Sequence, residues 1–140
     1  MRTLLTALIL LVASAAQAGD EEIVSPSEFR DYAEGWTLYF ERDGQHFGSE
    51  EFREDGRVRW RYRDGTCVEG AWRSHGAQLC FLYDSANSDG SVQCWRVLRQ
   101  DDDLIVRLLD GPNAQNPGLE LRVSGRDKKP LLCGDPGTRT

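Results

Sequence analysis

The sequence has little of what common hydrolases and nucleic acid-binding proteins use. It holds only two histidines, His46 and His75, and no G-x-S-x-G segment, which disfavours a serine hydrolase triad. Basic residues are outnumbered, since 17 lysines and arginines face 23 acidic residues. Phosphate neutralisation needs a basic surface, so we expect no nucleic acid partner. C-x-x-C pairs are also missing, which disfavours structural zinc and thioredoxin-type redox sites.

One long apolar run is present, at the N-terminus. Arg2 precedes an apolar stretch from Leu4 to Ala16, and the A-x-A segment Ala16-Gln17-Ala18 ends it. These are the parts of a cleavable secretory signal, so residues 1–18 are predicted to be a signal peptide. An uncleaved membrane anchor is the alternative, but the stretch is short for a span. We expect a periplasmic or secreted protein with no stable membrane insertion after cleavage.

The rest of the sequence predicts one short helix followed by strands. Ser25-Pro26-Ser27-Glu28 is typical of a helix start and predicts a helix over Pro26–Glu34, ended by Gly35. Beyond it, short apolar segments alternate with turns such as Asp43-Gly44, a strong hairpin signal. The predicted strands are Trp36–Glu41, His46–Phe52, Arg57–Arg63, Thr66–Arg73, Gln78–Tyr83, Ser91–Arg99, Leu104–Leu109 and Leu119–Val123.

This spacing predicts a mostly β fold. Strands joined by tight turns form an antiparallel up-and-down meander, and about eight of them suggest a lipocalin-like barrel, preceded by the short capping helix. The expected organisation is a signal peptide over 1–18, an N-terminal segment with the helix over 19–35, and a barrel-like domain over 36–124. Residues 125–140 are predicted to be an irregular tail tied down by a disulfide.

Four cysteines in an exported chain predict two disulfides. If the loop after Gln78–Tyr83 is centred near Asn87, Cys80 lies directly opposite Cys94, close enough for a bond. Cys67 and Cys133 then form the second bond. Four cysteines allow two other connectivities, which the sequence leaves open.

The clearest alternation is in the segment 57–63, where Val58, Trp60 and Tyr62 share one face. The opposite face carries a row of arginines, which either contributes to an anion or ligand site with Trp60 and Tyr62 or forms a solvent face paired with Glu51, Glu69 or Glu120. That row consists of Arg57, Arg59, Arg61 and Arg63.

The tryptophans admit two interpretations as well. Eight strands can enclose one small molecule, so these side chains either line a ligand cavity or fill the core. They are Trp36, Trp60, Trp72 and Trp95.

The acidic residues do not indicate a particular catalytic or metal site. Glu50, Glu51, Glu54 and Asp55 gather beside one turn, and we expect them to be solvated. The segment 84–90 superficially resembles a calcium loop, but its glycine stands at the seventh position and an alanine replaces a ligand. The sequence thus predicts no catalytic residue, no metal and no cofactor.

Four short motifs carry a resemblance: G-x-T-x-Y-F from Gly35, C-x-x-G-x-W from Cys67, C-F-x-Y from Cys80 and C-W from Cys94. Over residues 34–95 the chain resembles a family of short exported proteobacterial proteins of unknown function. This resemblance implies a periplasmic location and no particular activity. Trp36 departs from the family, which more often has a polar residue there.

Gly35-Trp36, which lead from the helix into the first strand, carry a weaker resemblance to periplasmic metalloprotease inhibitors. Those proteins are eight-stranded barrels behind an N-terminal trunk, but their disulfides are placed differently. Because no catalytic motif stands out, the barrel-like domain is predicted to be a non-catalytic binding module whose partner is a small ligand or a periplasmic protein. The alternative is a protease inhibitor acting through the segment from Gly19 to Tyr32, and a carboxylate-pair enzyme ranks last.

Overall fold

A computed structural model describes residues 20–84, 92–110 and 118–134 of the chain, and the expected signal peptide lies outside them. Within the described residues, no helix is long and apolar enough to cross a membrane. The elements are β1 (Glu21–Val24), α1 (Pro26–Ala33), β2 (Thr37–Arg42), β3 (Gln45–Phe52), β4 (Arg57–Tyr62), β5 (Cys67–His75), β6 (Gln78–Tyr83), β7 (Gln93–Gln100), β8 (Asp103–Asp110) and β9 (Glu120–Asp127).

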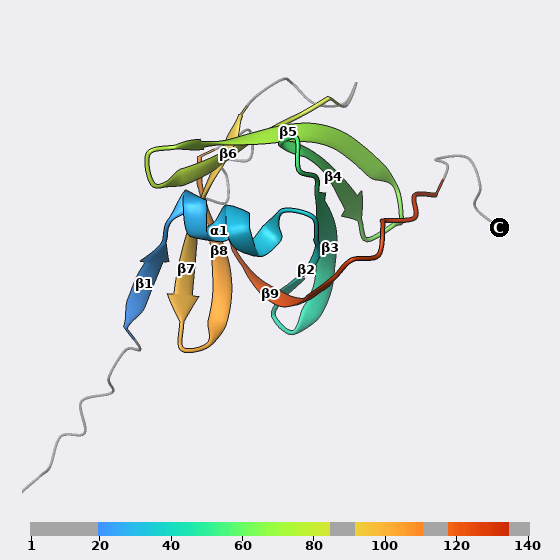
Figure 1. Ribbon diagram of the computed structural model, residues 1–140. Coiled ribbons are helices and arrows are strands. Elements are labelled where there is room, and N and C mark those ends of the chain that lie inside the picture. Colours follow the sequence, from blue (N-terminus) through green and yellow to red (C-terminus); the bar gives the residue numbers. More distant parts are fainter. Residues whose placement is uncertain (1–19, 85–91, 111–117, 135–140) are drawn as a thin grey trace, which may run out of the picture.

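Strands β2 to β9 form a closed antiparallel barrel of eight strands, as the sequence predicts (Figure 1). Each strand pairs with the next along the chain, and β9 closes the barrel by pairing with β2. The expected segment Gln78–Tyr83 is β6 without change, and the other seven strands differ by one to four residues at their ends. Closure pairs each of the eight strands on both sides over part of its length, which limits the exposed edges that can lead to aggregation.

The ninth strand, β1, is not predicted by the sequence. Its four residues pair antiparallel with β7, where Val24 lies opposite Val97. β6 pairs with β7 only as far as Trp95, so β1 occupies the edge that β6 leaves open. This four-residue segment, with its two glutamates, shows no clear alternation of polar and apolar residues. It forms a strand because it can pair with the open edge of β7.

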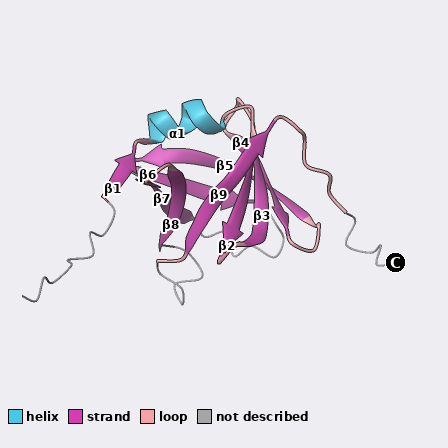
Figure 2. Cartoon of the chain, turned by 90° about the horizontal axis from the view of Figure 1, so that it is seen from below, coloured by secondary structure: helices cyan, strands magenta, loops and turns pink. Residues whose placement is uncertain are grey.

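Helix α1 lies along one end of the barrel (Figure 2). Its start follows the predicted signal, since the Ser25 hydroxyl accepts a hydrogen bond from the Glu28 amide at 3.1 Å. Phe29 is 1% exposed and packs edge-to-face against Phe52 and Trp72, with ring centroids 5.6 and 6.1 Å away. The helix therefore closes this end with a dense aromatic cluster.

Both predicted disulfides are present. Cys80 lies directly opposite Cys94 in the β6–β7 register, with Cα atoms 4.1 Å apart. The Cys67–Cys133 bond spans 66 positions of sequence and fastens the tail to the start of β5. Closing so long a loop lowers the entropy of the unfolded chain, worth about 4 kcal/mol in the chain-entropy model.

The tail begins later than the sequence suggests, because β9 continues to Asp127. Its described part, residues 128–134, then crosses the outside of the barrel. The Thr37 hydroxyl donates to the Lys129 carbonyl at 2.7 Å, and the Leu131 amide donates to the Glu51 carboxylate at 3.0 Å. Leu131 is 8% exposed, so the segment is packed in place as well as cross-linked.

Candidate functional site

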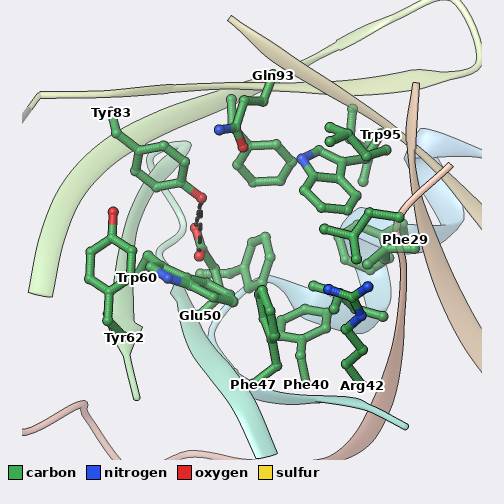
Figure 3. A pocket seen from close by; sticks show the side chains of 17 residues that line it. Phe29, Phe40, Arg42, Phe47, Glu50, Trp60, Tyr62, Tyr83, Gln93 and Trp95 are labelled. Atoms are coloured by element: carbon green, nitrogen blue, oxygen red, sulfur yellow. Dashed lines mark hydrogen bonds between the residues drawn. The ribbon is translucent and has the colours of Figure 1, made fainter. Parts of the chain in front are cut away.

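The barrel encloses a cavity of about 340 Å³. Phe29 and Phe52 line it at the end closed by α1, whereas Arg42 and Tyr62 line it at the opposite end, where β2 and β4 finish. The side chains of Arg42 and Tyr62 are about half exposed, so among the described residues the cavity opens at this end. Figure 3 shows the lining side chains around the hollow. The other lining residues are Phe40, Phe47, Glu50, Trp60, Leu79, Phe81, Tyr83, Gln93, Trp95, Val106, Leu108, Leu119 and Leu121.

Two strand glycines let aromatic rings lie flat against the barrel wall. A Cβ atom built on Gly48 would lie 2.2 Å from the Trp60 ring, and one on Gly70 would lie 2.7 Å from the Tyr83 ring. Both distances are far below van der Waals contact, so a larger residue at Gly48 would displace the Trp60 ring, and one at Gly70 would clash with the Tyr83 ring and with the Leu82 carbonyl oxygen, 2.6 Å away. Glycine is disfavoured within strands, and its use here marks a close approach of neighbouring groups.

Glu50 is the one carboxyl among the described residues that line the cavity. It lies in the middle of β3, between Leu38 of β2 and Trp60 of β4, and is 2% exposed. The expectation that Glu50 is solvated was therefore wrong. Its position two residues before the inward Phe52 places it on the inner face, because side chains alternate along a strand.

The Glu50 carboxyl has a hydrogen-bond partner across the cavity. The Tyr83 hydroxyl lies 3.0 and 3.2 Å from its two oxygens, the contact drawn as dashes in Figure 3. Burial raises the pKa of Glu50 to about 8, although the hydrogen bond from Tyr83 partly opposes this shift. The carboxyl is therefore mostly protonated and neutral at pH 7.

The two tyrosines near Glu50 stay neutral as well. Burial and the nearby Glu50 charge raise the pKa of Tyr83 well above its ordinary value. Burial, followed by the charges of Glu50 and Asp64, raises the pKa of Tyr62. The polar part of the lining thus presents uncharged hydroxyl and carboxyl groups at neutral pH, with Arg42 at the rim as the charged exception.

The predicted ligand residues are separated by the barrel wall. Trp60 and Tyr62 line the cavity, whereas the arginine row of β4 lies on the outside. Arg59 contacts Glu69 at 2.5 Å, as the solvent-face interpretation expects, and Arg57 contacts Asp84. The other two members are Arg61, which donates to the Leu132 carbonyl, and Arg63, which is exposed.

The four tryptophans divide between cavity and packing. Trp60 and Trp95 line the cavity. Trp72 is 5% exposed and belongs to the aromatic cluster under α1. Trp36 lies outside the cavity lining, where the Arg126 guanidinium stacks 4.1 Å from its ring centre. Trp60 and Trp95 thus face the cavity, Trp72 fills the core, and Trp36 packs against the core from outside, while a ligand in the cavity stays a prediction.

The comparisons with protein-family models, curated proteins and solved structures gave no match. The resemblance to short exported proteobacterial proteins stays a prediction. Function therefore has to be inferred from the geometry and chemistry of the cavity itself.

Proposed function

We propose that the chain is a non-catalytic, exported binding protein that holds a small, largely apolar ligand inside its barrel. The observation that carries this proposal is the cavity of about 340 Å³. A cavity of about 150 Å³ is enough to bind benzene. A compact molecule of about two fused rings would therefore fill this one.

The lining has the composition of a ligand site. Known small-molecule pockets are mostly apolar, with a few polar groups that fix the orientation of the ligand. Here aromatic and aliphatic side chains form most of the wall, and the polar groups are Glu50, the two tyrosine hydroxyls, Gln93 and Arg42. Gly48 and Gly70 preserve the hollow by making room for neighbouring rings in the wall.

Export is the second part of the proposal. The N-terminal signal supports it, and two disulfides suit an oxidising compartment such as the periplasm or the extracellular space. Each bond also constrains the unfolded chain, which stabilises the folded barrel in such a compartment.

The inhibitor alternative is supported less well. A segment that enters a partner's cleft has to be free of its own fold. Glu21–Val24 instead pair with β7, and the side chain of Phe29 in α1 is buried against the barrel. Most of the expected inhibitory segment is therefore part of this molecule's own fold and is not free to enter a partner's cleft.

An enzyme built on two carboxylates is also supported less well. Glycoside hydrolysis needs a second carboxyl about 5–10 Å from the first. Glu50 has no such companion among the described lining residues. Its neutral carboxyl is better suited to orient a bound molecule.

The test uses 1-naphthylamine, a neutral two-ring fluorophore at pH 7 that brightens in apolar surroundings. We expect saturable binding to the mature chain with one site. Leu119→Trp adds bulk to the cavity wall and should raise the Kd at least about tenfold. The matched control, Leu132→Trp, changes a side chain that is 82% exposed and should leave the Kd unaltered.

Near-ultraviolet circular dichroism would show whether both variants fold. If Leu119→Trp does not, amide chemical-shift changes in the wild-type protein locate the probe. Shifts gathered at Glu50, Tyr83 and Trp95 support the proposal. Shifts confined to the outer surface, or no saturable binding by the folded protein, would overturn it.

A further inference from the structure

Aromatic rings dominate the cavity lining, and one carboxyl lies among them. Of the described lining residues nine are aromatic, and Glu50 lies among them (Figure 3). The face of an aromatic ring carries partial negative charge and attracts cations, most strongly where water is excluded. Cages of such rings are the usual way in which proteins hold organic ammonium groups.

Among the described residues, Glu50 has no positively charged partner. In the part of the chain that the structure describes, no lysine or arginine forms an ion pair with it, and its hydrogen bonds come from Tyr83. The adjacent Glu51 differs, because it accepts hydrogen bonds from Arg53 and from the Leu131 amide. A buried, ionisable carboxyl that faces a cavity marks a candidate functional site.

We propose that the ligand is an organic cation, an amine or quaternary ammonium with a compact apolar body, whose charge lies against Glu50 among the aromatic rings. This inference rests on the proposed function, and it adds the chemical class of the ligand. The cation would supply the missing counter-charge, and the rings would replace the water around it.

The remaining polar groups fit a cation that enters with its charge inward. Tyr62 and Tyr83 offer neutral hydroxyls beside Glu50. Arg42 is the positive group of the lining, but it lies at the open end, is half exposed, and is 3.8 Å from Asp43. Its charge is therefore screened by water and by that partner, and it opposes a cation mainly at the rim.

Two probes of almost equal shape separate charge from size. Phenyltrimethylammonium carries a permanent positive charge, and tert-butylbenzene has a carbon in place of its nitrogen. We expect phenyltrimethylammonium to bind the wild-type protein at least about tenfold more tightly than tert-butylbenzene at pH 9. Glu50→Gln should remove most of that preference, whereas Glu51→Gln, which changes the next carboxyl on the outer face, should keep it.

The release of protons on ligand binding tests the inference without any variant. The protonated Glu50 has to ionise when a cation binds, so calorimetry in buffers of different ionisation enthalpy should show release of nearly one proton at pH 7. The affinity for phenyltrimethylammonium should rise at least about tenfold from pH 6 to pH 9. The affinity for tert-butylbenzene should change little over that range.

The outcomes distinguish this inference from the proposed function. If both probes bind equally, with no proton release and no effect of Glu50→Gln, the cavity binds ligands but the cation inference is wrong. If neither probe nor 1-naphthylamine binds the folded protein, the proposed function fails and the inference fails with it.

Discussion

The two ends of the barrel interior differ in how they use aromatic side chains. Under α1, Phe29, Phe52 and Trp72 pack edge-to-face, with ring centroids 5.6 to 6.1 Å apart, and each is at most 5% exposed. Toward the open end, rings of the same kind surround a hollow, and Tyr62 is 48% exposed. The packed aromatic cluster under α1 therefore stabilises the fold, whereas the rings toward the open end line the cavity.

The difference arises from what fills the barrel axis at each end. The helix packs Phe29 against Phe52 and Trp72 at one end, whereas the described lining at the other end leaves a hollow. In the open half, the polar Glu50 and Tyr83 take positions that apolar side chains would occupy in an ordinary core. We therefore expect the closed end to determine the free energy of unfolding and the open end to determine binding.

The largest effect is expected for Phe29→Ala. Removing this ring opens a void in the packed cluster and should lower the free energy of unfolding by about 3–5 kcal/mol, measured by denaturant titration. Phe47→Ala is the matched change at the open end, where the side chain is half-buried and lines the cavity. Phe47→Ala should lower the free energy of unfolding by less than half as much as Phe29→Ala. An equal decrease in the two variants would contradict the division between the two ends.

The free energy of unfolding should also fall as the pH rises, because of Glu50 in the cavity. Burial raises the pKa of Glu50 from 4.5 to about 8, so between these values the folded protein keeps a proton that the unfolded chain has lost. The free energy of unfolding should fall by up to about 1.4 kcal/mol per pH unit across this window, and level off above it. The slope is obtained from denaturant titrations at several pH values.

Variants isolate the contribution of Glu50 from that of other titrating groups. Glu50→Gln should lose this slope and become more stable than the wild-type protein near pH 8. Glu51→Gln alters a carboxyl of the same strand outside the cavity, and it should retain the slope. A Glu50→Gln variant with the wild-type pH dependence would mean that Glu50 titrates normally.

Much of the fold could be predicted because local signals agree with it. The Asp43-Gly44 turn adopts the positive φ angles that its residues favour, at 51° and 76°. The hairpin symmetry that brought Cys80 opposite Cys94 needs only a turn centre and strand geometry. Such signals act within a few residues, so a single sequence is enough to read them.

The site was harder to predict because it depends on contacts between distant strands. Glu50 belongs to the inner face by its spacing from Phe52, but nothing nearby in the sequence shows that Tyr83 reaches it from β6. The strand glycines Gly48 and Gly70 were the available signal, since each indicates a close approach. What approaches them, Trp60 and Tyr83, is decided by the barrel as a whole.

The smallest effect on stability is expected at the rim, for Arg42→Gln. This side chain is half exposed and its partner Asp43 is 93% exposed, so the free energy of unfolding should change by no more than about 0.5 kcal/mol. Binding should respond differently, because the variant removes the positive charge that opposes an entering cation. We expect its affinity for phenyltrimethylammonium to rise about twofold to fivefold at low salt, and the gain to shrink as salt screens the rim. A large loss of stability together with unchanged cation affinity would place Arg42 in the packed part of the barrel and move the boundary between the two ends.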